Sequence, residues 1–260
     1  MHQENIEKLA VGFILYFPSK NIEKKINLFL NKNIKVYVFE NSKSILEINN
    51  QHLHLLGNNT NQGLGVALRE IGERAFFDKK EFLLYFDQDT EISSSIIKIL
   101  DFYIEYLKLD EKCISINIKE NKELIFKEVP ITINSGSLYH IPKLKKIGFH
   151  KKEIFVDGLD FEFSLRSRIH GFRLFKAYSF QTINHNVNQD GDGTKIFGKS
   201  HVLFKKYPNK RYINIIIISV KLFIKSLKNN DFAYALGIIK FLIIFINFQM
   251  IVSLIKFFKK

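Results

Sequence analysis

Apolar runs that stop at polar residues mark the strands expected in the first ninety residues. We expect four strands, over residues 9–17, 34–39, 52–56 and 82–86. Long apolar runs without alternation are typical of strands buried on both faces, as in a parallel sheet. Two helices are expected between these strands. One is indicated by the helical spacing of apolar residues over Asn21–Leu30, and the other ends near Phe77. The pattern predicts the order strand, helix, strand, strand, helix, strand, which is an α/β arrangement with a mostly parallel sheet.

Acidic residues follow two of these strands. Asp87 and Asp89 come directly after the fourth strand, and Glu40 closes the second. Ligands of open α/β sheets bind at the carboxyl ends of the strands. Two carboxylates at that edge suit Mg²⁺ or Mn²⁺ bound together with phosphate oxygens. The alternative is a polar turn without a ligand, and a motif of three residues leaves both interpretations open.

The second half of the chain gives weaker signals. Residues 131–141 alternate like a strand around a bend of small residues, where Gly136 would let another group approach the backbone. A short helix is expected from Pro142 to Gly148, and a strand over Leu174–Phe180. These elements extend the predicted sheet beyond the first four strands.

A further acidic pair precedes a helix expected over Phe161–Ile169. Asp157 and Asp160 lie at its start, where an aspartate commonly caps a helix. A base that takes a proton from a substrate hydroxyl is the other role for such a residue, and the helix N-terminus would keep it ionised. Glu162 and Arg166 are four residues apart, which predicts an ion pair.

Composition and charge divide the chain in two. Of 260 residues, 46% are hydrophobic, enough for one large core or two small ones, and a single cysteine, Cys113, excludes a disulfide framework and a thiolate zinc site. The net charge is +13, but residues 202–260 hold eleven Lys or Arg and one acid, Asp231. This placement predicts a boundary near residue 200.

The basic tail has the pattern of membrane-binding helices. In Ile213–Lys228 the polar side chains share one face; they are Asn214, Lys221, Lys225 and Lys228. Residues 232–255 are more apolar, but Lys240 and two amides interrupt them. We expect a peripheral helix on an anionic bilayer, with insertion across the membrane or packing on the catalytic part as alternatives. Because Met1–Lys8 are polar, no secretory signal is expected, so the predicted location is the cytoplasm, on the inner face of the plasma membrane.

Several ordered motifs resemble one known family over about residues 9–200. They are Tyr16-Phe17-Pro18, Phe39-Glu40-Asn41-Ser42, Asn61-Gln62-Gly63-Leu64-Gly65, Phe86-Asp87-Gln88-Asp89-Thr90, Asn134-Ser135-Gly136-Ser137 and Phe155-Val156-Asp157-Gly158-Leu159-Asp160. Together they resemble the inverting family 2 glycosyltransferases of the GT-A fold. The Asp-Gln-Asp form resembles the bacterial rhamnosyltransferase branch of that family.

The resemblance implies a fold and a set of site residues. Residues 1–200 would form a GT-A nucleotide-diphospho-sugar transferase domain, with a donor half over about 9–100 and an acceptor half over about 101–200, followed by a helical tail over 201–260. It makes Asp160 the catalytic base. Its predicted donor-binding residues are Tyr16, Glu40, Asn61, Gly63, Asp87, Gln88 and Asp89. Its predicted acceptor-binding residues are Ser135, Gly136 and Asp157. The predicted ligands of Mg²⁺ or Mn²⁺ are Asp89, Asp87 and His185.

The resemblance also implies a reaction. A sugar, rhamnose from dTDP-rhamnose by preference, would pass from a nucleotide diphosphate to a hydroxyl of a lipid-linked or growing surface glycan. Residues 188–200 are turn-rich and would close over the donor to exclude water. Glu40 stands where the family usually has an aspartate near the nucleobase, so the preference for one nucleobase stays open. Phe163 stands where tryptophan is common in the family, and the chain has no tryptophan.

Three alternatives accompany this interpretation. One is the same fold with another donor, such as a UDP-hexose, and one is a nucleotidyltransferase, which would favour a basic glycine-rich loop after the first strand. Phe17-Pro18-Ser19 provides no such loop. The third is a non-catalytic membrane- or nucleic-acid-binding protein that uses the basic tail. We expect no nucleic-acid partner, and a homo-oligomer remains open.

Overall fold

A computed structural model describes the chain except for residues 20, 44–45, 121–124, 180–182, 186–206 and 259–260. Within the described part, the chain forms two units, Met1–Asn184 and His185–Lys260. The boundary predicted near residue 200, and the loop predicted over 188–200, lie outside the described residues.

The predicted order of the first six elements is confirmed. They are β1 (Leu9–Leu15), α2 (Ile22–Leu30), β2 (Lys35–Glu40), β3 (Leu53–Gly57), α3 (Leu64–Phe77) and β4 (Phe82–Asp87). The four strands pair in parallel in the order β3-β2-β1-β4. Parallel strands are covered on both faces, which is why their sequences are apolar throughout. Every residue of β1 is buried.

The second half completes an eight-stranded sheet of order β3-β2-β1-β4-β8-β6-β9-β7. Its elements are α4 (Ile96–Leu109), β6 (Cys113–Glu120), β7 (Ile125–Glu128), β8 (Ser137–His140), α5 (Ile141–Ile147), α6 (Leu159–Ile169) and β9 (Arg173–Ser179). Strand β8 is antiparallel to both β4 and β6, and β7 is antiparallel to β9. The predicted mixed, mostly parallel sheet is therefore confirmed.

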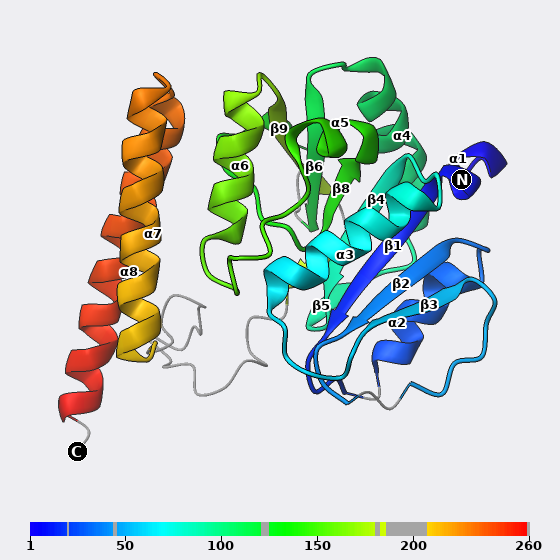
Figure 1. Ribbon diagram of the computed structural model, residues 1–260, viewed down its shortest axis with the longest axis horizontal. Coiled ribbons are helices and arrows are strands. Elements are labelled where there is room, and N and C mark those ends of the chain that lie inside the picture. Colours follow the sequence, from blue (N-terminus) through cyan, green and yellow to red (C-terminus); the bar gives the residue numbers. More distant parts are fainter. Residues whose placement is uncertain (20, 44–45, 121–124, 180–182, 186–206, 259–260) are drawn as a thin grey trace. The chain divides into compact units, whose positions relative to one another are not determined.

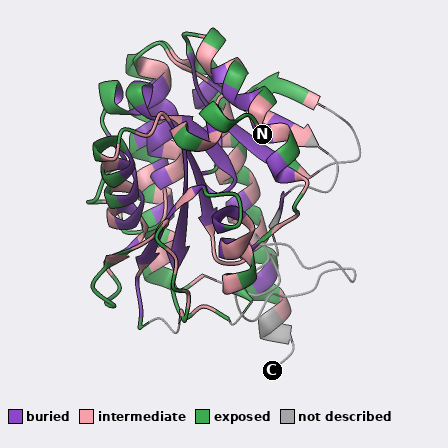
Figure 2. Cartoon of the chain, turned by 90° about the vertical axis from the view of Figure 1, so that its right-hand side faces the viewer, coloured by how far each residue is buried: buried purple, intermediate pink, exposed green. Residues whose placement is uncertain are grey.

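Helices cover both faces of this sheet, so its strands form a buried centre (Figures 1 and 2). Alternate strand residues point to opposite faces. Val36 and Val38 belong to the hydrophobic cluster that contains residues of α2 and α4, whereas Tyr37 and Phe39 belong to the cluster that contains residues of α3 and α5. The first unit thus has two hydrophobic cores, one on each face of a single sheet.

The strand expected over residues 131–141 is wrong in extent, because only Ser137–His140 pair as a strand. The preceding segment bonds to a helix instead. The backbone N–H of Thr132 donates to Ser164 Oγ at 3.1 Å, and that of Asn134 donates to Asp160 Oδ1 at 2.9 Å. Side chains of α6 therefore occupy the donors that a neighbouring strand would otherwise use.

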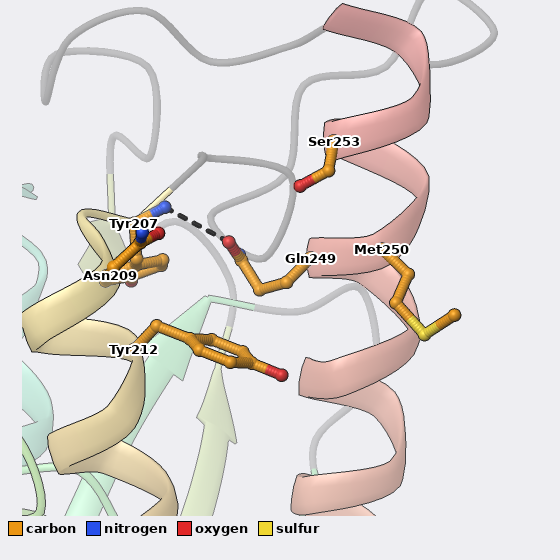
Figure 3. Close-up of a pocket in the computed structure, with 6 residues that line it drawn as sticks. All are labelled: Tyr207, Asn209, Tyr212, Gln249, Met250 and Ser253. Atoms are coloured by element: carbon orange, nitrogen blue, oxygen red, sulfur yellow. Dashed lines mark hydrogen bonds between the residues drawn. The ribbon is translucent and has the colours of Figure 1, made fainter. Parts of the chain in front are cut away.

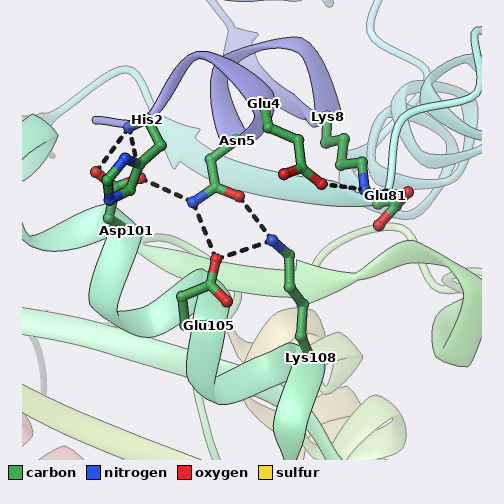
Figure 4. A network of polar contacts seen from close by, with 8 residues as sticks. All are labelled: His2, Glu4, Asn5, Lys8, Glu81, Asp101, Glu105 and Lys108. Carbon is green, nitrogen blue, oxygen red and sulfur yellow. Dashed lines mark hydrogen bonds and ion pairs between the residues drawn. The ribbon is translucent and has the colours of Figure 1, made fainter.

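A short first helix, α1 (Gln3–Lys8), is tied to α4 by polar contacts (Figure 4). Buried Asn5 donates from Nδ2 to Asp101 at 2.9 Å and to Glu105 at 3.2 Å, and its Oδ1 accepts from Lys108 Nζ at 2.8 Å. Because all three contacts converge on one buried amide, this polar segment is part of the fold.

The second described unit contains a helical hairpin. Helix α7 (Asn209–Lys228) begins four residues before the predicted start, after Pro208. A short connection leads to α8 (Phe232–Phe258), and Asp231 Oδ1 caps α8 by accepting from the N–H of Tyr234 at 3.1 Å. The buried residues of α7 recur at three- and four-residue spacing; they are Ile215, Ser219, Leu222 and Ser226. In length and composition, the stretch Phe232–Ile255 is sufficient to cross a membrane.

An open cavity of about 210 Å³ lies in this hairpin (Figure 3). Its lining residues are Tyr207, Asn209, Tyr212, Gln249, Met250 and Ser253. The backbone N–H of Tyr207 donates to Gln249 Oε1 at 3.1 Å. Gln249, which interrupts the apolar pattern of α8, is thus used to bind the segment before α7.

Candidate active site

The carboxyl ends of β1, β2 and β4 bring the predicted donor residues to one edge of the sheet. Leu15 lies opposite Glu40, and Ile14 lies opposite Asp87, so the two acids flank the end of β1. Neighbouring strands are about 4.8 Å apart, which places the backbones of Glu40 and Asp87 about 10 Å from each other. This span fits a ligand with a nucleoside at one end and a diphosphate at the other.

The Asp-Gln-Asp turn is held by its central residue. Asp87 ends β4, and Asp89 precedes β5 (Thr90–Ile92); both are partly exposed. Gln88 accepts from the N–H of Tyr16 at 2.6 Å and donates to the carbonyl of Tyr16 at 2.7 Å. The amide of Gln88 therefore pairs with the main chain of Tyr16 and holds the turn, and its contact with a donor stays a prediction.

A lysine of α2 also binds the Asp-Gln-Asp turn. Lys25 of α2 donates from Nζ to the carbonyl of Gln88 at 3.0 Å and forms an ion pair with Glu91 at 3.2 Å. The side chain of Lys25 is only 11% exposed. Because Gln88 is bound through both its side chain and its carbonyl, the turn that presents the two aspartates has a fixed shape.

Two exposed aromatic rings follow β1 at this edge. Tyr16 and Phe17 are 48% and 72% exposed, and their ring centroids lie 4.6 Å apart. Phe17 has a φ of 50°, in the left-handed region, and its N–H donates to Ser42 Oγ at 2.7 Å. An exposed ring held in a strained conformation is typical of a binding surface. The donor contact of Tyr16 stays a prediction.

The glycines at the start of α3 serve close packing. Leu64 N–H donates to the carbonyl of Phe155 at 2.6 Å, and a Cβ on Gly63 or Gly65 would collide with segment 151–155. The N–H of Gly63 donates to Asn61 Oδ1 at 3.1 Å. The first N–H of α3 is thus engaged within the chain, and the donor contacts of Asn61 and Gly63 stay predictions.

Ser135 and Gly136, the predicted acceptor-binding residues, are buried. The hydroxyl of Ser135 accepts from the N–H of Asp87 at 3.0 Å and lies 2.8 Å from the Thr90 hydroxyl. Gly136 donates to the carbonyl of Tyr85 at 2.8 Å with a φ of 76°. Both residues join the turn before β8 to the end of β4, and their contact with an acceptor stays a prediction.

Asp160 lies in the first turn of α6 but does not cap it. Gly158 is the N-cap residue, and the carboxylate of Asp160 accepts the N–H of Asn134 from another segment. Burial raises the pKa of Asp160 to about 6, although hydrogen bonding from Asn134 opposes the rise. Burial therefore outweighs the helix N-terminus that we expected to keep the carboxyl fully acidic. A pKa near 6 suits a base at neutral pH.

The segment Asn134-Ser135 connects the two acidic parts of the site. Asn134 binds Asp160, and its neighbour Ser135 binds the backbone of Asp87. Two consecutive residues of one segment therefore hydrogen-bond to the base predicted on α6 and to the predicted donor turn after β4.

Two other predictions near α6 have different outcomes. The ion pair of Arg166 with Glu162 is confirmed at 2.9 Å, and both side chains are buried. Arg166 also donates to the carbonyl of Ile147 at 2.9 Å, so the pair is part of the core. Asp157, partly exposed just before the N-cap Gly158, stays a predicted acceptor contact.

The predicted metal ligands are oxygen donors suited to Mg²⁺ or Mn²⁺. No group of three or more His, Cys, Asp or Glu side chains in the described part of the chain is gathered as a metal site. Asp87 and Asp89 fit a cation that takes one or two carboxylates and completes its shell with phosphate and water. Strand β10 (Ile183–His185) pairs with β5, which follows Asp89, but the side chain of His185 lies outside the described residues.

Comparisons with known proteins identify chains of similar sequence and fold. No family model matches the chain. The dTDP-rhamnosyl transferase RfbF of Shigella flexneri is 28% identical over 191 residues, which are 61% of this chain and 62% of that protein. Two structures of S. aureus TarS 1–349 are also similar. One has a TM-score of 0.50 at 18% identity, covering 66% of this chain and 60% of that chain.

The other TarS structure is a complex with UDP-GlcNAc. It has a TM-score of 0.52 at 16% identity, covering 82% of this chain and 66% of that chain. The resemblance to bacterial family 2 glycosyltransferases is confirmed. The similarity to TarS shows the GT-A fold alone, and the chain spans less than two thirds of the relatives that it matches.

Three buried residues around the site were absent from the sequence predictions as functional residues. They are Asn134, Tyr139 and His150. Asn134 belongs to the Asn-Ser-Gly-Ser motif, which gave a signal for the segment but not for the residue. His150 lies in the loop between α5 and α6, and nothing in its sequence neighbourhood indicates that it reaches the site.

Proposed function

We propose that this chain is an inverting glycosyltransferase that moves a sugar from a nucleotide-diphosphate donor to a hydroxyl of a lipid-linked or growing surface glycan. One observation carries the proposal: Asn134-Ser135 joins the Asp160 carboxylate to the Asp-Gln-Asp turn at the carboxyl edge of a GT-A sheet. We favour dTDP-rhamnose as the donor because of the similarity to a dTDP-rhamnosyl transferase. A UDP-hexose is the alternative.

The reaction follows from the roles of the acids. Asp160 accepts the proton of the acceptor hydroxyl, and the hydroxyl oxygen forms a bond to the anomeric carbon. The bond from that carbon to the diphosphate oxygen breaks on the opposite side, and its electron pair leaves with the nucleotide diphosphate. Attack from the opposite face inverts the configuration. When bound by Asp89 and Asp87, Mg²⁺ or Mn²⁺ would neutralise charge on the leaving diphosphate.

A screen of sugar nucleotides by thermal shift tests this proposal. A ligand at one hundred times its Kd stabilises the folded state by about 2.7 kcal/mol. For a chain of this size that is a rise in Tm of about 5–10 °C. We expect dTDP-rhamnose to give such a shift with Mn²⁺ and a smaller one with EDTA. The proposal is wrong if no dTDP-, UDP- or GDP-sugar shifts the Tm with Mn²⁺.

We further propose that the helical hairpin binds an anionic membrane surface. Helix α7 leaves an apolar stripe exposed at three- and four-residue spacing; its members are Ile213, Ile217, Val220, Ile224 and Leu227. Lys221, Lys225 and Lys228 are exposed on the same helix. Exposed large apolar residues on α8 are Phe232, Leu236, Ile243, Met250, Ile251 and Leu254. An apolar stripe beside lysines fits the boundary between lipid chains and anionic headgroups.

Changing Lys221, Lys225 and Lys228 to glutamate should weaken vesicle binding. Each lysine near an anionic surface contributes about 1 kcal/mol, and salt screens this attraction. We expect the wild type to float with phosphatidylserine vesicles at low salt, and the variant to be partly released. Lys24, Lys32 and Lys98, exposed on the first unit, provide a control with the same change of charge. Wild-type protein that stays at the bottom of the gradient would exclude membrane binding.

A further inference from the structure

Asn134 lies between the two acidic parts of the site and is itself buried. Its main-chain N–H donates to Asp160 Oδ1 at 2.9 Å, and the next residue, Ser135, binds the N–H of Asp87. The main-chain contact holds one carboxylate oxygen of Asp160. This main-chain contact does not explain why the buried side chain of Asn134 is polar.

The side chain of Asn134 is fixed by two neighbours. Its Oδ1 accepts from the Tyr139 hydroxyl at 2.7 Å and lies 2.9 Å from His150 Nε2. Because a carbonyl oxygen only accepts, His150 carries its proton on Nε2. Burial lowers the pKa of His150 to about 3, so the ring is neutral at the pH of the cell. Two donors on Oδ1 leave only one orientation for the amide.

In that orientation the amide nitrogen is on the side of Asp160. Asn134 Nδ2 is buried and makes no hydrogen bond of ordinary geometry in the part of the chain that the structure describes. It still lies near enough to Asp160 to lower the pKa of that carboxyl. The oxygen of Asn134 has a structural role as the acceptor for Tyr139 and His150. A buried N–H group without a full partner destabilises a fold, so Nδ2 contributes nothing to that role.

Aromatic rings hold this arrangement. His150 stacks on Phe163 of α6 at 4.9 Å between ring centroids and meets Tyr139 and Tyr85 edge-on at 5.7 and 5.8 Å. Phe163 lies one turn after Asp160, and Tyr85 lies two residues before Asp87. The cluster therefore holds α6 against β4 close to Asp160 and Asp87.

We propose that Asn134 is a positioning residue for the Asp160 base, with its amide oriented by Tyr139 and His150 so that its N–H group faces the carboxylate. The proposal rests on the proposed function for the role of Asp160 as a base. It assigns to Asn134 two effects: the direction in which the carboxylate points, and the preference for its ionised form. Tyr139 and His150 stay neutral between pH 5 and pH 8, since burial raises the pKa of the Tyr139 phenol and lowers that of His150.

A comparison of stability with and without Asp160 tests the electrostatic part independently of any activity. The unfolding free energy of a variant pair, with Asp160 and with Asp160→Asn, is measured from pH 4 to pH 9. Their difference changes with pH until Asp160 is ionised in the folded state, so it reports the pKa of that carboxyl. We call the pH at which this difference levels off the midpoint, since it reports the pKa of Asp160 in the folded state. In the Asn134→Leu background we expect the midpoint to rise by about one pH unit, because the ionised carboxylate loses an N–H group that stabilises it.

Ser164→Ala is the matched control. Ser164 is buried on the same helix and accepts a backbone N–H from the same segment, one turn beyond Asp160. It should leave the midpoint unchanged. If Asn134→Leu folds poorly, Tyr139→Phe removes one of the two donors that orient the amide and should raise the midpoint by a smaller amount. An unchanged midpoint in both variants overturns the proposal, even if the enzyme transfers no sugar.

The kinetic readout follows once a donor is known. Asn134→Leu should lower kcat by about tenfold or more with little change in the KM for the donor, and shift the acid limb of the pH profile upward. A merely structural Asn134 predicts lower stability with the same pH profile, which is the expected behaviour of Ser164→Ala.

Discussion

Asp160→Asn is expected to lower sugar transfer by about 10²-fold or more while donor binding is kept, because asparagine cannot accept the proton of the acceptor hydroxyl. The variant retains an oxygen for the N–H of Asn134, which binds Asp160 Oδ1 at 2.9 Å. In the wild type, transfer should fall as the pH drops below about 6, where Asp160 becomes protonated. Initial rates and donor titrations of the two proteins measure these effects.

The same substitution should stabilise the fold at neutral pH. The pKa of Asp160 is raised from 3.8 to about 6 in the folded chain. The unfolded chain therefore loses this proton first, and stability falls as the pH rises through this range. One pKa unit corresponds to about 1.4 kcal/mol, and partial exposure reduces the effect, so we expect a gain of about 1–2 kcal/mol for Asp160→Asn above pH 7.

A structural aspartate would behave in the opposite way. If Asp160 served the helix alone, the asparagine variant would be equally or less stable at pH 8 and would transfer sugar at nearly the wild-type rate. Urea unfolding at pH 8, together with the initial rates, separates the two roles. Lower activity with higher stability is the expected signature of a residue selected for chemistry.

Asp89→Asn should abolish metal-dependent donor binding and leave the fold intact. An amide keeps the shape of the carboxylate but not its charge, and a hard divalent cation requires the charge. The turn itself should persist because Gln88 and Lys25 hold it through other atoms. Calorimetric titration with dTDP and Mn²⁺ should show an affinity at least about 10²-fold weaker than in the wild type, equal to its value in EDTA.

Glu91→Gln provides the control for that titration. Glu91 is an exposed acid two residues beyond Asp89, and it pairs with Lys25. Its loss removes the same charge from the same turn, yet dTDP should bind with Mn²⁺ as in the wild type. Equal affinities for wild type and Asp89→Asn would show that Asp89 holds no metal.

The sheet and its acidic edge could be predicted because apolar runs and strand ends are local signals. The register that places Glu40 and Asp87 on either side of β1 follows from parallel pairing alone. The role of Gln88 could not be predicted. Its bonds to Tyr16 join residues 72 positions apart, and no local pattern reports such a pairing.

Small residues were the hardest to interpret. Gly63, Gly65 and Gly136 resemble ligand-binding glycines in sequence, but here another backbone segment approaches each of them closely. A phosphate and a backbone carbonyl that approach closely both require a residue without a Cβ. The sequence alone therefore does not distinguish a ligand-binding glycine from one that packs against another segment. The burial of Asn134 and His150 was equally hidden, since polar residues are usually exposed.

The most direct test is the release of nucleotide diphosphate from dTDP-rhamnose, followed by phosphorus NMR with Mn²⁺ and a set of octyl glycosides as acceptors. We predict that the wild type releases dTDP in step with a new glycoside of inverted configuration, and that Asp160→Asn releases it at least about 10²-fold more slowly. Equal rates for the two proteins, or no release by the wild type from this or any other sugar nucleotide, would contradict the account.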